Sequence, residues 1–212
     1  MRLRVTFSKS GMLRYTGHLD LHRLWERTCR RASIPLKYSQ GFHPQPRISI
    51  GSALPLGFIG MAELIDIQLD EDRDPDSIRE KLKNAAPPGL DISSIAIVDP
   101  KLPALQTQIE SADYRVEFLD LVDSSQLEES IATVLEANSI PRVRKGKNYD
   151  LRPLILSLTL EGNPEREKPG LSMRLKAEPG ATGRPEEVLS ELGITPEGSR
   201  ITRISLNLSK TE

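Results

Sequence analysis

The residues with most scope for chemistry lie between positions 17 and 60, where all three histidines of the chain occur. His18 and His22 are four residues apart, so one helical turn could place both imidazoles beside one metal ion. The segment has no HExxH motif, no cysteine cluster and no third ligand of assured geometry, so we expect no metal site and favour local hydrogen bonding of His18 beside Asp20. A histidine can also act as acid or base on an RNA 2′-hydroxyl, which makes His18, Asp20 and His43 the catalytic candidates.

Basic residues are concentrated near the start of the chain. Residues 1–50 contain ten Lys or Arg against two acids, whereas residues 51–140 contain 6 against 18. A helix expected over residues 18–32 would turn its arginines away from Leu21 and Trp25, giving a solvent-facing row of guanidinium groups. Such a row could hold the phosphates of a polyanion, or be a plain solvated face. The candidates for nucleic-acid binding are Arg23, Arg27, Arg30, Arg31 and, beyond the helix, Arg47.

The loop over residues 40–46, QGFHPQP, offers aromatic rings beside this basic helix. One glycine and two prolines restrict its shape, while Phe42 and His43 project from it. A stacking ring with basic neighbours is what recognition of single-stranded RNA requires. The Gly-rich stretch 51–60, GSALPLGFIG, lacks Walker spacing and a Lys-Ser/Thr pair, so it is not a P-loop. It is either an ordinary connection or a place where backbone approaches a neighbouring element or a phosphate closely.

A second basic cluster follows the acidic middle of the chain. Residues 141–155 contain five basic residues and one acid. Four cations around Gly146 would form a flexible hairpin that contacts phosphates, each contact adding salt-sensitive affinity. The alternative is a solubilising edge that blocks strand pairing. The candidates here are Arg142, Arg144, Lys145, Lys147 and Arg152.

The composition excludes several classes of protein. No apolar run approaches the roughly 18 residues of a membrane span, and the N-terminus lacks the apolar core of a signal peptide. Cys29 is the single cysteine, so an internal disulfide is impossible and one thiol cannot alone build a zinc or iron–sulfur site. We therefore expect a cytoplasmic protein with no cofactor of its own and no membrane partner.

Hydrophobic periodicity predicts the same order of elements twice. The first half has strands or extended pieces near 3–7, 36–39, 47–50, 63–69 and 90–98, and helices at 18–32 and 74–86. The second half has strands at 114–119, 154–160, 171–177 and 200–208, and helices at 124–138 and 184–192. Ser125 and Glu128 have capping-box spacing near the start of the helix at 124–138.

This βαββαβ order is the ferredoxin-like pattern. We predict an α+β protein of two tandem ferredoxin-like units, each with an antiparallel sheet and its helices on one face. The units would span 1–99 and 112–212, joined by a linker over 100–111.

Three stretches resemble a known family: YTGHLDLHRLWERTCRRASIPLKYSQGFHPQPRISIGSALPLG, ELIDIQL and RKGKNYDLRPLI. They are similar to the radical SAM-linked protein family, domain of unknown function 2344, over nearly the whole chain. In that family the domain stands alone or follows a radical SAM, cobalamin-binding-type domain, so the resemblance implies a partner that carries the iron–sulfur chemistry. The motif positions are Gly17, His18, Leu19, Asp20, Gln40, Gly41, Phe42, Pro44, Pro46, Lys145, Gly146, Lys147, Asp150, Leu151, Arg152 and Pro153.

These observations favour an accessory module over an enzyme. It would bind RNA, or present a substrate, for a radical SAM enzyme that modifies tRNA or rRNA, with that enzyme as a separate or fused partner. One alternative is a metal-independent endoribonuclease with His18 or His43 as acid or base, by analogy of fold with CRISPR repeat-processing endoribonucleases. Another is a scaffold that docks the radical SAM partner through the acidic middle segment without binding RNA.

Overall fold

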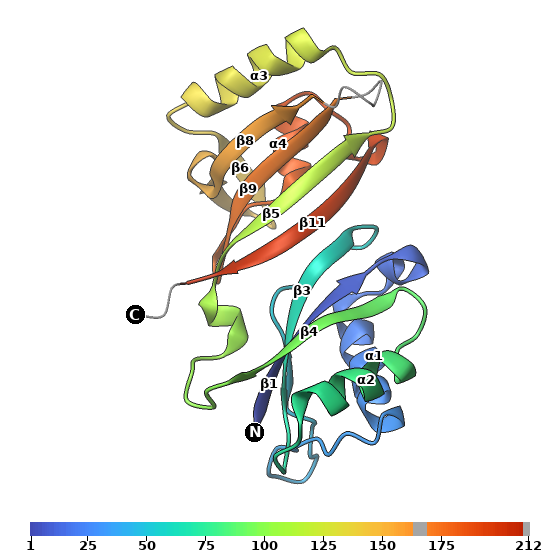
Figure 1. Cartoon of the computed structure of the whole chain (residues 1–212). Helices are drawn as coiled ribbons and strands as arrows, with labels where there is room; N and C mark the ends of the chain where they lie inside the picture. Colours follow the sequence, from blue (N-terminus) through green and yellow to red (C-terminus); the bar gives the residue numbers. More distant parts are fainter. Residues whose placement is uncertain (163–168, 210–212) are drawn as a thin grey trace. The chain divides into compact units, whose positions relative to one another are not determined.

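The computed structural model of the chain describes residues 1–162 and 169–209. The chain divides into two compact units, Met1–Ile109 (unit 1) and Glu110–Glu212 (unit 2) (Figure 1). It is a mixed α+β protein whose described residues include four α-helices and mainly antiparallel strands. None of the helices in the described ranges is long and apolar enough to cross a membrane.

Unit 1 is a four-stranded antiparallel sheet with two helices. Its elements are β1 Arg2–Lys9, α1 His18–Arg31, β2 Ile48–Ile50, β3 Ile59–Gln68, α2 Pro75–Ala85 and β4 Leu90–Val98. Short 3₁₀ turns occupy Gly11–Tyr15 and Leu105–Gln108. The strand order is β4-β1-β3-β2, and all three pairings are antiparallel.

The core of unit 1 lies between the sheet and the helices. Leu3, Val5 and Phe7 alternate along β1 and are fully buried, as their period-two spacing predicts. Trp25 of α1 is also fully buried and meets Phe7 edge to face, with ring centroids 5.0 Å apart. Residues of α2 belong to the same apolar cluster, so both helices cover one face of the sheet.

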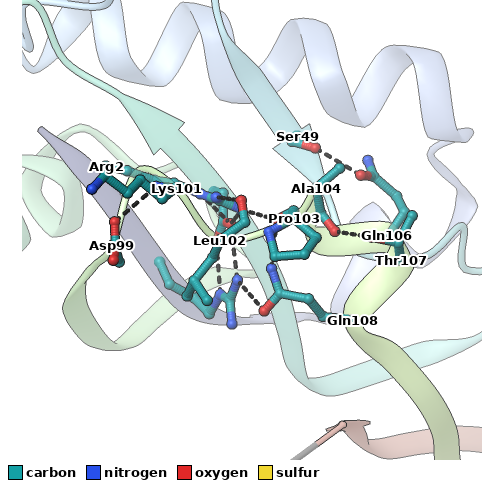
Figure 2. Close-up of polar contacts among 12 residues, drawn as sticks. Arg2, Ser49, Asp99, Lys101, Leu102, Pro103, Ala104, Gln106, Thr107 and Gln108 are labelled. Carbon is teal, nitrogen blue, oxygen red and sulfur yellow. Dashed lines mark hydrogen bonds and ion pairs between the residues drawn. The ribbon is translucent and has the colours of Figure 1, made fainter. Parts of the chain in front are cut away.

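The opposite face of unit 1 carries an ion network of Arg2, Arg4 and Asp66 that is largely shielded from solvent. Figure 2 shows Arg2 beside the segment that contains Leu102, Pro103 and Gln108. Arg2 donates to Oδ2 of Asp66 from Nε at 2.9 Å and from Nη2 at 2.6 Å, and Arg4 donates to Oδ1 at 2.8 Å. Arg2 also donates to the carbonyl oxygens of Leu102 and Pro103, at 2.7 and 2.9 Å. The stretch expected as a linker therefore has hydrogen bonds to the sheet of unit 1 through residues 102 and 103.

Unit 2 has more strands than the sequence predicts. Its elements are β5 Ile109–Phe118, α3 Ser124–Glu136, β6 Pro141–Arg144, β7 Lys147–Asp150, β8 Ile155–Glu161, β9 Gly170–Glu178, β10 Ala181–Thr182, α4 Pro185–Glu191 and β11 Ser199–Leu208. Strands β8, β9, β5 and β11 are neighbours in that order, and β10 pairs with the end of β9. Strands β6 and β7 form a separate two-stranded ribbon.

One local expectation was wrong, and another is met only by isolated bridges. The capping box of Ser125 and Glu128 does not start α3, because Asp123 is the N-cap and its carboxylate accepts the backbone N–H groups of Ser125 and Gln126. The extended piece expected at 36–39 contains two isolated bridges, Leu36 to Leu69 and Tyr38 to Pro46, and no continuous strand is assigned there.

Candidate nucleic-acid interface

Helix α1 places its four arginines around one hollow. The helix turns Leu21, Trp25 and Cys29 into the core, so the helical period directs the basic side chains outward, as predicted. The hollow has a volume of about 660 Å³ and carries the guanidinium groups on its walls. Its lining residues are Thr16, Asp20, Arg23, Leu24, Arg27, Arg30, Arg31 and Pro87.

These arginines are exposed, but their partners differ in exposure: Asp20 is exposed, Glu26 is half-buried, and the buried Thr28 accepts from Arg31 at 3.4 Å. Arg23 donates to Asp20 at 3.3 Å, and about two thirds of each side chain is exposed. Arg30 donates to Glu26 at 2.6 Å. Within residues 1–162 and 169–209, Arg27 has no ion pair. Exposed pairs of this kind contribute about 0–1 kcal/mol, so phosphate oxygens can replace the carboxylates at little cost. We call Arg23, Arg27, Arg30 and Arg31 the α1 row.

Phe42 stands in solvent at the tip of its loop. The loop is closed at its base by the Ser39 N–H, which donates to the Gln45 carbonyl at 2.8 Å, and by the Gln45 N–H, which donates to Oγ of Ser39 at 2.9 Å. The ring of Phe42 is fully exposed, and His43 beside it is exposed as well. An exposed aromatic ring on a closed loop can stack on a base without a conformational change.

The loop positions of the family motif shape this tip. Gly41 has a φ of 127°, a conformation that side chains rarely adopt, whereas Pro46 is buried at the base of the loop. Gln40 and Pro44 are exposed. None of these residues lines the α1 hollow.

Arg47 does not join the α1 row. Its neighbour Ile48 is buried in the core, and strand alternation sends Arg47 to the opposite face of the sheet. There it lines a different hollow together with Arg2 and Asp66. Arg47 therefore lies on the face that carries the ion network, away from α1.

The histidine pair at the start of α1 has no third metal-ligating side chain grouped with it among the described residues. The residues at 1–162 and 169–209 contain no group of three metal-ligating side chains. Gly17 is the N-cap of α1, with no side-chain cap, and Asp20 accepts from Arg23 at 3.3 Å. Burial lowers the pKa of His18, and the charges of His22 and Lys9 lower it further. Nε2 of His22 lies 3.3 Å from the carbonyl oxygen of Ile48.

Beneath this helix start lie two buried charged residues that the sequence analysis missed. Lys9 is 1% exposed and donates from Nζ to the Thr16 carbonyl oxygen at 2.7 Å, while Glu63 is 2% exposed. A Cβ at Gly60 would lie 2.5 Å from Cγ of Glu63, so any other residue would have to displace the buried Glu63 side chain. The signal for Lys9 was present, since it continues the alternation of inward residues along β1. The Gly-rich stretch thus permits a close approach by a buried side chain.

The second basic cluster forms an ordered β-hairpin in unit 2. Its turn residues, Lys145 and Gly146, have φ values of 47° and 74°, and they connect Arg144 to its cross-strand partner Lys147. Positive φ at both turn positions suits the right-handed twist of the strands. Arg142 forms an ion pair with Glu191 of α4. Arg144, Lys145 and Lys147 are exposed.

Two other residues of this cluster are part of the fold. Arg152 donates from Nε and Nη2 to the Leu135 carbonyl oxygen, at 3.2 and 2.8 Å, and from Nη1 to that of Ile155 at 3.1 Å. Oδ1 of Asp150 accepts the backbone N–H groups of Ile140 and Arg152, and the bond from Ile140 is the main cause of the lowered pKa of Asp150. We therefore leave Arg152 out of the interface.

Comparison with known proteins is consistent with an α+β domain of uncharacterised function. Residues 2–185 match the family described as "Uncharacterized protein conserved in bacteria (DUF2344)", and the chain belongs to this family. No curated protein matches the sequence.

Solved structures are similar in fold only. A chain of the "Cbf5-Nop10-Gar1 Complex" is 7% identical with a TM-score of 0.51, and the match covers 96% of this chain and 48% of that one. A chain of the "archaeal box H/ACA sRNP Nop10-Cbf5 complex" is 7% identical with a TM-score of 0.46, covering 97% and 48%. The chain thus spans about half the length of these chains.

Proposed function

We propose that this chain is a non-catalytic RNA-binding module. The observation that carries the proposal is the α1 row, in which four exposed arginines surround one hollow and only Asp20 and Glu26 oppose them within the helix. Guanidinium groups pair with phosphate oxygens through two parallel hydrogen bonds, and Phe42 supplies a ring for an unpaired base. Arg144, Lys145 and Lys147 of the hairpin would contact further phosphates.

We infer that each unit is a ferredoxin-like repeat. The strand order β4-β1-β3-β2 of unit 1 has its counterpart in β11-β5-β9-β8 of unit 2, with one helix after the first strand and one before the last. The ribbon β6–β7 and the short β10 are additions of unit 2. Each unit would then present its own basic surface, α1 in the first and the hairpin in the second.

The partner in this proposal is a radical SAM enzyme that modifies tRNA or rRNA. The support is the resemblance of the motifs around α1 and the hairpin to the radical SAM-linked family. In this arrangement the chain would hold the RNA while the partner performs the chemistry. Co-purification of the two proteins, with and without RNase treatment, tests whether they bind each other directly.

Salt dependence of RNA affinity is the direct test. Four phosphates held on a single strand give a slope of log K against log salt of about −3. We expect Arg23→Glu/Arg27→Glu to weaken binding and to flatten this slope. The matched control is Arg73→Glu/Lys101→Glu, which reverses two exposed charges of unit 1 that do not line the hollow. Equal losses in both variants would mean that net charge, not the α1 row, holds the RNA.

The rival functions give different results in the same assay. Metal-independent cleavage of the RNA that disappears in His18→Gln would establish the endoribonuclease, for which the lowered pKa of His18 provides a neutral imidazole. Binding to the radical SAM partner with no affinity for RNA at low salt would establish the docking scaffold.

A further inference from the structure

A second hollow, in unit 2, brings together two arginines from distant parts of the sequence. It has a volume of about 340 Å³. Arg144 comes from the end of β6 and Arg184 from the residue before α4; both elements are labelled in Figure 1. The remaining lining residues are Tyr149, Asp150, Leu154, Gly180, Ala181 and Thr182. The sequence analysis did not single out Arg184.

The fold fixes both walls of this hollow. The turn at Lys145 and Gly146 holds Arg144 at the tip of the hairpin, paired with Lys147. On the other side the chain reverses at Gly180, where φ is 85°, and β10 pairs back onto β9. A Cβ at Gly183 would lie 3.1 Å from the Leu154 carbonyl oxygen, so the glycine lets this segment pack closely against the 3₁₀ turn that contains Leu154.

The charges in the hollow favour an anion. Within residues 1–162 and 169–209, neither guanidinium group has a hydrogen bond or an ion pair. The one carboxylate in the lining, Asp150, already accepts two backbone N–H groups on a single oxygen. Two guanidinium groups and one carboxylate leave the lining with a net charge of +1. Nearby Glu187 accepts the hydroxyl hydrogen of Tyr149, and its carboxylate also interacts with the charges of Arg144 and Arg142.

The shape and the apolar surface indicate more than a bare phosphate. The volume is at the lower end of the range for small-molecule sites and exceeds the need of one phosphate group. The ring of Tyr149 and the side chain of Leu154 provide apolar surface beside the two guanidinium groups. A phosphate monoester carries close to two negative charges at neutral pH, which matches two guanidinium forks better than the single charge of a diester does.

We propose that this hollow binds a nucleotide through its phosphate monoester, with Arg144 and Arg184 holding the phosphate and Tyr149 beside the nucleoside. This deepens the RNA-binding proposal and rests on it, since the natural ligand would be the phosphorylated end of an RNA chain. A free mononucleotide has the same chemistry and is the second source of such a ligand.

Isothermal titration of the full chain with AMP, adenosine and inorganic phosphate tests the site itself. We expect AMP to bind at least tenfold more tightly than either adenosine or phosphate, and Arg144→Gln or Arg184→Gln to weaken AMP binding roughly tenfold. Arg200→Gln is the control, because Arg200 pairs with Glu117 on the sheet and does not line the hollow. AMP affinity equal to that of adenosine or of phosphate, or unchanged in both variants, overturns the proposal.

A second readout needs no variant. Addition of AMP should shift the backbone amide NMR signals of Gly180 and Thr182, and an absence of shifts there at saturating AMP refutes the site. The affinities of an oligoribonucleotide with a 5′-phosphate and of the same oligoribonucleotide with a 5′-hydroxyl then distinguish an RNA end from a free mononucleotide as the natural ligand. A preference for the phosphorylated chain that disappears in Arg184→Gln supports an RNA end, whereas AMP binding without that preference overturns the RNA-end assignment.

The two proposals fail in distinguishable ways. Loss of RNA binding in Arg23→Glu/Arg27→Glu with AMP affinity unchanged supports both. Absence of RNA binding in the wild type, with AMP bound through Arg144 and Arg184, refutes the RNA module and leaves a nucleotide site.

Discussion

Removal of the Asp66 carboxylate should be among the most destabilising single changes in unit 1. Asp66 is 3% exposed and is the acceptor for both Arg2 and Arg4, so Asp66→Ala leaves two guanidinium groups buried without their counter-charge. Breaking one side of a buried pair typically costs about 3–5 kcal/mol. Because Arg4 keeps a bond to Gln108 at 3.2 Å and Arg2 keeps two carbonyl partners, we expect the lower half of that range.

Urea unfolding followed by Trp25 fluorescence measures this change, since the single tryptophan is buried in unit 1. The control is Glu71→Ala in the same unit, whose carboxylate is paired with Arg73 at 2.9 Å but is exposed. Hydrogen exchange at residues 102–108 provides a second readout, because Arg2 is held by Asp66 and in turn binds the carbonyls of Leu102 and Pro103. A loss below about 1 kcal/mol with unchanged exchange would refute the reasoning.

Three further predictions follow from single residues. Gly60→Ala should destabilise unit 1 by about 1–3 kcal/mol in thermal unfolding, since its Cβ would collide with Glu63. Gly162→Ala is the control for replacing a glycine, because Gly162 has open space around it and no positive φ. Arg152→Gln should lower the free energy of unfolding by about 2 kcal/mol and leave RNA affinity unchanged in a filter-binding assay, because its donors serve backbone carbonyls. The pKa of His18 in the folded chain lies below its ordinary value, so the unfolded chain takes up the proton first as the pH falls. The free energy of unfolding should therefore decrease as the pH drops below about 6.5. Urea titrations at several pH values measure this dependence, and His18→Gln should flatten it.

The elements were predictable wherever one periodicity covered them. Leu3, Val5 and Phe7 define β1, and β4 has the predicted bounds, Leu90–Val98, because one face of each strand is buried. The start of β5 was missed since Glu110 and Asp113 interrupt its apolar pattern, although the strand begins at Ile109. Single-sequence patterns cannot show hydrogen bonds such as those from Arg2 to Leu102 and Pro103, which give order to a stretch rich in Pro and Gln.

The candidate site was predictable in part, because helical spacing alone places the α1 row on one face. Arg47 was assigned to that surface by its position in the chain, and strand alternation directs it elsewhere. Arg184 was missed for the opposite reason: it has no basic neighbours in the sequence, and the β9–β10 turn brings it beside Arg144.

Charge in the sequence overstates the basic surface of unit 1. The net of +8 over residues 1–50 includes Arg2, Arg4 and Lys9, whose side chains are buried and hydrogen-bonded within the fold. A cation so engaged is not available to a polyanion, and removing it costs stability instead of affinity. The arginines of the α1 row remain exposed, and Arg27 has no ion pair among the described residues. Charge reversal at Arg27 should therefore lower RNA affinity with little effect on the free energy of unfolding. Charge reversal at Arg4 should mainly lower the free energy of unfolding. The two opposite results would distinguish a binding surface from a structural one within the same fifty residues.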